Sequence, residues 1–322
     1  MSRNLLTLSV VAALSGGMAR AEVPAVAADI APVHALVARV MEGVGTPALI
    51  VTPGGSPHEY SLRPSEASAL QEADLVVWMG HALTPWLDGA IDTLAGDATL
   101  LTLMEAEGTV ELPVRENALF EAHDHDDHEE ADDHEADDHD HEDHDDHHGD
   151  GAHDPHAWLS PDNAALWMDL IAAELAIADP ENAALYQANA LAGRAELEIV
   201  KAEIAALLEP VRGQGFIVFH DAYQYFETAF DFPAAGAISL SDATDPSPAR
   251  ITAIQARVAA QGVTCILSEP QFNPGIVAAV MDGSDAQTAI LDPLGSDLEP
   301  GAALYPALLR NLARTLADCL QR

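Results

Sequence analysis

Three histidines and one aspartate lie where apolar runs of the sequence end, or in the loops that follow. His58 comes one turn after the run PALIV, His220 ends the run FIVFH, and Asp292 ends the run TAILD. His156 lies in HDPHAWLSP, ahead of a helical stretch. Ligands of open parallel sheets bind beyond the carboxyl ends of the strands. We therefore expect these four side chains to converge if the apolar runs are strands of such sheets.

Three neutral imidazoles and one carboxylate form a tetrahedral shell typical of Zn²⁺, with nitrogens about 2.0–2.1 Å from the ion. Imidazole-rich sets disfavour Mg²⁺ and Ca²⁺ and, less strongly, Mn²⁺, which prefer more oxygen ligands. None of the four residues has the i, i+4 spacing of a helical site, so tertiary structure must assemble this one. Taken singly, His58 also suits a turn, His220 a buried strand end, and His156 the end of the histidine-rich run described next.

The segment 123–148 consists of nine histidines, fifteen carboxylates and two alanines. This composition buries too little apolar surface to offset the entropy of ordering, so we expect disorder there without metal. We interpret the run as a set of weak metal sites that gather or sense Zn²⁺, and a solubilising acidic tract is the alternative. The histidines are His123, His125, His128, His134, His139, His141, His144, His147 and His148.

Short apolar runs alternate with helical stretches along the chain, which indicates an α/β fold with mostly parallel sheets. PALIV and ADLVVWMG are predicted strands of the first half, and FIVFH, AAGAISL, TCILS and TAILD of the second. Between the halves, residues 181–210 predict one long helix rich in Ala, Leu and Glu, suited to joining two lobes. Further helices are predicted after Pro64 and over 160–176, 222–230, 248–261, 274–282 and 301–320.

The N-terminus has the pattern of a cleaved secretory signal of the Gram-negative type. Arg3 precedes an apolar stretch too short to span a bilayer, and Ala-Arg-Ala at 19–21 is a cleavage signal. We therefore expect a periplasmic protein that is not inserted in the membrane. The predicted division is a signal peptide (1–21), an N-terminal α/β lobe (22–180) with a disordered loop (121–153), a linker helix (181–210) and a C-terminal α/β lobe (211–322).

The formal net charge of −40 argues against nucleic acid and anionic membranes as partners, and favours cations or basic partners. Cys265 and Cys319 are the two cysteines of the chain. A disulfide between them is expected in an oxidising compartment, and two buried free thiols are the alternative. A metal site built on cysteine is not expected, because the sequence has no CxxC pair.

Five motifs occur in the order SPHEYSLRPS, DPHAWLSP, FHDAYQYFE, SEPQF and LDPLG. Together they resemble the bacterial metal-binding lipoprotein and adhesin family of ABC-transporter solute-binding proteins, and most closely its periplasmic zinc branch, the ZnuA proteins. The resemblance covers the expected mature chain outside the run. It implies two Rossmann-like lobes joined by a long rigid helix, with the metal in the cleft between them. His58 and His156 would be ligands from the first lobe, and His220 and Asp292 ligands from the second.

The resemblance also bears on which metal is bound. Manganese members of the family carry Glu at the position of His220, so the histidine favours zinc. A His/acid-rich loop before the DPH motif is frequent in zinc members, and the cysteine pair resembles their second-lobe disulfide. Some zinc members have Glu directly before the first ligand histidine, whereas Pro57 stands here and Glu59 follows. The oxygen ligand is therefore open among Asp292, Glu59 and water, with His153 as a spare ligand.

This resemblance implies a monomeric, non-enzymatic binding protein that captures Zn²⁺ and delivers it to the membrane permease of an ABC importer with a cytoplasmic ATPase. The alternative within the family is a manganese or ferrous-iron binding protein. A zinc hydrolase would need a general base, for which Glu59 or Glu269 is available, but the HExxH motif is absent. A metal buffer or metal chaperone whose main site is the run is a third hypothesis.

Overall fold

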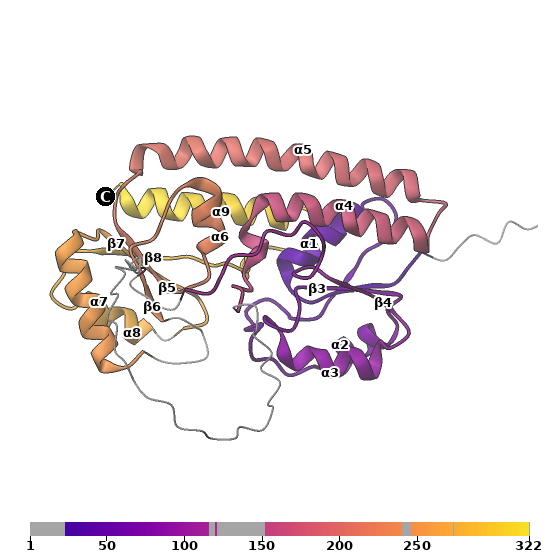
Figure 1. Ribbon diagram of the computed structural model, residues 1–322, viewed down its shortest axis with the longest axis horizontal. Helices are drawn as coiled ribbons and strands as arrows, with labels where there is room; N and C mark the ends of the chain where they lie inside the picture. Colours follow the sequence, from indigo (N-terminus) through magenta and orange to yellow (C-terminus); the bar gives the residue numbers. More distant parts are fainter. Residues whose placement is uncertain (1–22, 116–119, 121–151, 240–245, 273, 322) are drawn as a thin grey trace, which may run out of the picture.

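The computed structural model describes residues 23–115, 120, 152–239, 246–272 and 274–321. The predicted signal peptide and the nine histidines of the run lie outside the described residues. The described chain forms two four-stranded sheets in two lobes, and all the strand pairs recorded in them are parallel (Figure 1). The α/β fold class predicted from the sequence is confirmed.

Both sheets have the same topology. The first has the strand order β2-β1-β3-β4 and the second the order β6-β5-β7-β8. The apolar pattern predicts neither β1 nor β4, because β1 has only three residues and two residues of β4 are exposed. The strands are Val26–Ala28 (β1), Ala48–Leu49 (β2), Leu75–Trp78 (β3), Thr99–Thr102 (β4), Phe216–His220 (β5), Ala237–Ser239 (β6), Cys265–Ser268 (β7) and Gln287–Ile290 (β8).

Proline sets the start of several helices, because its ring presets the helical φ and its missing N–H needs no partner there. α2, α3, α4, α7 and α8 all begin on proline, and Ser160 and Ser247 cap α4 and α7. The helices are Ala31–Val40 (α1), Pro64–Gln71 (α2), Pro85–Leu94 (α3), Pro161–Ala178 (α4), Ala183–Leu208 (α5), Gln224–Phe230 (α6), Pro248–Gln261 (α7), Pro274–Met281 (α8) and Leu304–Leu320 (α9), with 3₁₀ turns at Ala157–Leu159 (η1) and Glu209–Val211 (η2).

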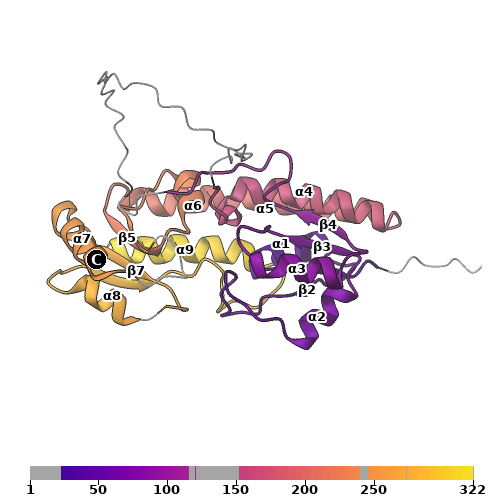
Figure 2. The same ribbon diagram turned by 60° about the horizontal axis from the view of Figure 1, so that its bottom comes forward.

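Each sheet is covered by helices on both faces. On one face, α5 extends along both lobes and packs against α4 and α9 (Figure 1). Its 26 residues correspond to about 39 Å at 1.5 Å per residue. On the other face, α2 and α3 cover the first sheet and α7 and α8 cover the second (Figure 2). Continuous apolar strands such as β3 and β5 are thus buried on both sides, as parallel strands require.

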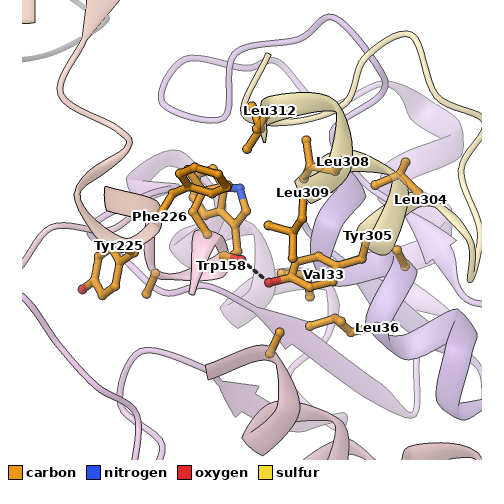
Figure 3. Packing of buried hydrophobic residues seen from close by; sticks show 14 of the residues in the cluster. Val33, Leu36, Trp158, Tyr225, Phe226, Leu304, Tyr305, Leu308, Leu309 and Leu312 are labelled. Atoms are coloured by element: carbon orange, nitrogen blue, oxygen red, sulfur yellow. Dashed lines mark hydrogen bonds between the residues drawn. The ribbon is translucent and has the colours of Figure 1, made fainter. Parts of the chain in front are cut away.

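One hydrophobic core continues from the first lobe into the second. Figure 3 shows side chains of α1, η1, α6 and α9 packed together in this cluster. Trp158 of η1 is buried there and donates a hydrogen bond from its indole nitrogen to the carbonyl of Pro293 (2.8 Å). The Tyr305 hydroxyl of α9 donates to the carbonyl of Trp158 (2.7 Å). The segment that carries His156 is therefore fastened to the second lobe, although it precedes α4 in the chain.

A disulfide joins Cys265 at the start of β7 to Cys319 near the end of α9. The pairing expected from the sequence is confirmed, and both cysteines are buried. In the described part of the chain, none of the helices combines the length and the apolar character that crossing a membrane requires.

Candidate metal centre

Three of the four predicted ligands come together between the two lobes. One ring nitrogen from each of His58, His156 and His220 lies within 4.8 Å of the corresponding atoms of the other two. The Nε2 atoms of His156 and His220 are 3.4 Å apart, and the ring centroids of His58 and His156 are 5.4 Å apart. Among the described residues, this is the group of histidine, cysteine or acidic side chains whose spacing suits a metal ion.

Each histidine is placed by a different element. His220 ends the central strand β5 and is 3% exposed, and His156 directly precedes η1 and is 6% exposed. His58 lies half-buried in the loop between β2 and α2. The Trp86 indole of α3 donates to the carbonyl of Pro57 (2.7 Å), which holds the backbone next to His58. The three imidazoles therefore converge where the end of β5 meets the β2–α2 loop and the segment before η1.

Buried carboxylates orient two of the three imidazoles. The Nδ1 atom of His220 is 2.6 Å from Oε1 of Glu269, and Nδ1 of His156 is 2.7 Å from Oδ1 of Asp154. A carboxylate offers only acceptors, so each Nδ1 carries the proton and each Nε2 presents its lone pair to the group. At 3.4 Å these two lone pairs repel each other unless a cation or a proton lies between them. The pair is arranged to receive a positive ion.

The pattern of apolar runs alone does not assign this orienting role to Asp154 and Glu269, although signals for it are present. Asp154 stands two residues before His156, within reach of the same ring. Glu269 directly follows β7, the neighbour of β5 in the sheet, so its carboxylate lies beside the strand end that carries His220. The sequence also makes Glu269 available as the general base of a zinc hydrolase. In the structure its Oε1 lies against the ring of His220.

Asp292, the fourth predicted ligand, is not brought into the histidine group. Its Oδ1 accepts the backbone N–H groups of Leu294 (2.9 Å) and Gly295 (3.0 Å). Its Oδ2 accepts the backbone N–H and the hydroxyl of Ser296 (both 2.6 Å). These four hydrogen bonds use the acceptor capacity of a carboxylate. Asp292 also follows β8, which is separated from β5 by β7, so it begins one strand further from His220.

The remaining predicted site residues lie at the surface or outside the described chain. Glu59 is exposed beside His58. The His153 side chain is 41% exposed and forms an ion pair with Glu111. Neither is in the histidine group. The nine histidines of the run lie outside the described residues, and their prediction as weak metal sites stays a prediction.

The buried phenol of Tyr223 lies close to both His220 and Glu269. Tyr223 stacks edge-on against the His220 ring, with centroids 6.4 Å apart, and donates to the carbonyl of Leu291 (3.1 Å). Burial, followed by the nearby charges of Glu269 and Asp292, holds the pKa of Tyr223 well above its ordinary value. The phenol therefore stays neutral, and the charge next to the imidazole comes from the carboxylate.

The protein has two α/β lobes with parallel sheets, and three imidazoles converge between them. This arrangement defines a two-lobed binding protein with a candidate metal centre. The family model described as "Zinc-uptake complex component A periplasmic" matches residues 26–319. This chain belongs to that family, ZnuA, and the resemblance read from the five motifs is confirmed. The family is that of the periplasmic components of zinc-uptake complexes.

The relatives span the full length of the chain. A protein of Brucella suis named "High-affinity zinc uptake system protein ZnuA" is 46% identical over 326 residues, covering 98% of each chain. A protein of the same name from Paracoccus denitrificans is 46% identical over 310 residues, covering 94% of this chain and 93% of the relative. The solved structure "Crystal structure of ZnuA" superposes with a TM-score of 0.73 at 23% identity, covering 93% of this chain and all of the other, and so shares the fold.

Proposed function

We propose that this protein captures Zn²⁺ in the periplasm and delivers it to an ABC-type zinc importer. The observation that carries this proposal is the convergence of His58, His156 and His220 between the lobes. Imidazole nitrogens are ligands that Zn²⁺ prefers, and carboxylate partners on Nδ1 fix the ring and raise its basicity as a ligand. The naming of full-length relatives as high-affinity zinc uptake proteins supports the same ion.

The ligand set favours zinc over the family's other cargo. Mn²⁺ prefers more oxygen in the shell, and the described group contains imidazoles only. We expect Zn²⁺ to displace Mn²⁺ from the protein in a competition titration read out by electron paramagnetic resonance of released Mn²⁺. Retention of Mn²⁺ at equimolar Zn²⁺ would contradict the choice of cargo.

For the fourth coordination position we propose Glu59 or a water molecule. Asp292 has its oxygens engaged by its own loop, whereas Glu59 is exposed and adjacent to His58. Glu59→Gln separates the two choices, because the substitution weakens zinc binding only if the carboxylate is a ligand. A zinc-bound crystal structure with anomalous scattering at the zinc edge answers the same question directly, because it shows whether a carboxylate or a water oxygen completes the shell.

For the run we propose the gathering or sensing of additional Zn²⁺, with each ion bound more weakly than between the lobes. The composition of the run predicts disorder without metal, so binding there carries an entropic cost that lowers the affinity per ion. In calorimetry, a chain that lacks 123–148 should lose the weak sites and keep the tight one. Loss of the tight site in that chain would show that the run, and not the histidine group, is the main site.

Delivery requires a membrane permease and the ATPase that drives it, and we propose these as the partners of a monomeric, non-enzymatic protein exported by the segment 1–21. No chemical step is needed, because capture and release are ligand exchange at the metal. Release follows when one imidazole leaves the ion.

The deciding experiment replaces the three histidines one at a time and together by alanine. Each single substitution should weaken zinc binding strongly, and the triple variant should lose the tight site. His81→Ala is the matched control, because the His81 side chain is 69% exposed and lies outside the group. Zinc binding is measured by competition with a chelator of known affinity. Tight binding that survives in the triple variant would overturn the assignment.

A further inference from the structure

The two chain segments that lead into and out of the run are paired with each other. The N–H of Val114 donates to the carbonyl of Ala152 (2.9 Å), and the N–H of Asp154 donates to the carbonyl of Leu112 (2.8 Å). These bonds form an antiparallel bridge of residues 112–114 with residues 152–154, which we call the root. Asp154, the last residue of the root, is the carboxylate that holds Nδ1 of His156.

The root is attached to α6 of the second lobe. The hydroxyl of Tyr225 accepts the N–H of Leu112 (2.9 Å) and donates to the carbonyl of Asp154 (2.9 Å). One phenol thus joins both strands of the root. Tyr225 is 2% exposed, so these bonds are shielded from water.

Arg115, the residue that follows the root, makes a fork-shaped contact with two buried carboxylates. Its Nε lies 3.0 and 2.9 Å from the two oxygens of Asp221, and Nη2 also donates to Asp221. Nη1 and Nη2 donate to the two oxygens of Glu227 (2.9 and 3.1 Å). The two carboxylate side chains are 6% and 5% exposed, and the guanidinium lies 3.6 Å from the ring centroid of Phe120.

This contact joins two of the three segments that carry histidines of the metal centre. Asp221 directly follows His220, so one end of the contact is fixed to the carboxyl end of β5. The other end is fixed to the root and, through Asp154, to the ring of His156. With both segments held in this way, the Nε2 atoms of His156 and His220 lie 3.4 Å apart.

We propose that Arg115 is a positioning residue of the zinc site, whose guanidinium links the His156 segment to the His220 segment and presets the spacing of the two Nε2 atoms. The inference rests on the proposed function, since it concerns the same site. The shape of the guanidinium carries the role, because its planar fork reaches two carboxylates at once, whereas a lysine ammonium is a single point charge. Charge and shape can therefore be separated by substitution.

The test uses the full chain with Arg115→Lys, which keeps the charge, and Arg115→Gln, which removes it. Arg310→Gln is the control, because Arg310 forms an ion pair with Glu203 on the surface (2.7 Å). Zinc affinity is measured by chelator competition, and the geometry of the site by the visible absorption bands of the Co²⁺-loaded protein. Both Arg115 variants should bind zinc on the order of 10- to 100-fold more weakly, with shifted cobalt bands, as substitutions behind metal ligands do. The control should match the unaltered protein.

Three outcomes overturn the inference. Folded Arg115 variants with unaltered zinc affinity and cobalt bands would show that the guanidinium does not set the site. If Arg115→Lys binds zinc as the unaltered protein does while Arg115→Gln binds it weakly, the charge of the side chain matters and its forked shape does not. If neither variant folds, Tyr225→Phe loosens the same root and should weaken zinc binding several-fold, and unchanged affinity in that variant also overturns the inference. The histidine substitutions test the proposed function separately, because they can abolish tight binding whatever Arg115 does.

Discussion

Each lobe places a buried carboxylate after one of its two central strands, Asp29 after β1 and Glu269 after β7, and the two lobes use it differently. In each sheet two central strands lie side by side, β1 with β3 and β5 with β7. In the first lobe Asp29 follows β1 and accepts the N–H of Met79 after β3 (2.7 Å). In the second lobe Glu269 follows β7 and accepts the N–H of His220 at the end of β5 (3.3 Å) and also its ring Nδ1 (2.6 Å).

The difference lies in what the neighbouring strand end offers the carboxylate. Asp29 accepts hydrogen bonds from two backbone N–H groups, the second from Ile30 (2.8 Å), so it links the end of β1 to the residue after β3. Glu269 accepts from an imidazole whose other nitrogen faces the metal centre. The same topology therefore serves stability in one lobe and ligand orientation in the other. The orienting role in the second lobe depends on the histidine that ends β5.

The lobes also differ in covalent cross-linking, which gives the largest expected effect. The disulfide closes a loop of 54 residues in sequence separation, which stabilises the fold by about 4 kcal/mol in the chain-entropy model. The double substitution of Cys265 and Cys319 by serine should lower the free energy of unfolding by that amount. Zinc affinity should stay within about threefold, because Cys265 stands at the opposite end of β7 from Glu269. Urea unfolding and chelator competition measure the two quantities. An unchanged unfolding midpoint would contradict the expectation.

Asp29 gives the second effect, a dependence of stability on pH that originates in the first lobe. Burial raises the pKa of Asp29 to about 7, against opposing hydrogen bonds from the backbone of Met79 and Ile30. Because this pKa lies above the unfolded value of 3.8, the folded state keeps its proton longer as pH rises. Stability present below about pH 4 is then lost between pH 4 and 7, on the order of 3 kcal/mol from this group.

The measurement is the free energy of unfolding of the metal-free protein at several values of pH. Asp29→Asn cannot titrate, so its difference from the unaltered protein should grow steadily between pH 4 and 7. Asp231→Asn, at a side chain that is 95% exposed, is the control and should follow the unaltered protein. A constant difference between Asp29→Asn and the unaltered protein would show that Asp29 titrates normally.

The third prediction compares the two carboxylates by zinc affinity. Glu269→Ala should weaken zinc binding on the order of 10- to 100-fold, because His220 loses the partner that orients its ring and makes it more basic. Glu269→Gln keeps an acceptor without the charge and should have an intermediate affinity. Asp29→Asn, at the end of a central strand of the other lobe, should leave zinc affinity within about threefold. Equal losses for the two carboxylates would contradict the division of roles between the lobes.

Much of the second lobe's strand arrangement can be predicted from the sequence, because the end of each apolar run marks the end of a strand. FIVFH ends in His220, and the strand, its end and the helix predicted over 248–261 all agree with the structure. The first lobe is harder to predict, since VAA is too short to distinguish strand from helix, so the position of Asp29 at a strand end is hidden. Short strands stabilised by their neighbours leave little periodic signal.

The limits for the site are similar. Convergence of the three histidines is predicted by the carboxyl-end rule and by the family resemblance, and the structure brings them within 4.8 Å. The link from Arg115 to Asp221 cannot be read from sequence, because 106 residues separate the two and nothing local marks the pairing. The rule that ligands bind beyond the carboxyl ends of strands predicts Asp292 as a ligand, because it follows a strand of the second lobe. The rule does not predict that the turn after Asp292 donates hydrogen bonds to its carboxylate.

Asp292 provides the smallest expected effect and the sharpest contrast with Glu269, since both follow strands of the second sheet. Asp292→Asn replaces one acceptor oxygen by a donor that faces the N–H and hydroxyl of Ser296, so stability should fall by about 1 kcal/mol. Zinc affinity should remain within about threefold, because the carboxylate is engaged by its own loop. Urea unfolding and chelator competition on the same samples measure both quantities. A large loss of zinc affinity without loss of stability would instead make Asp292 a ligand, and would require its turn to open when zinc binds.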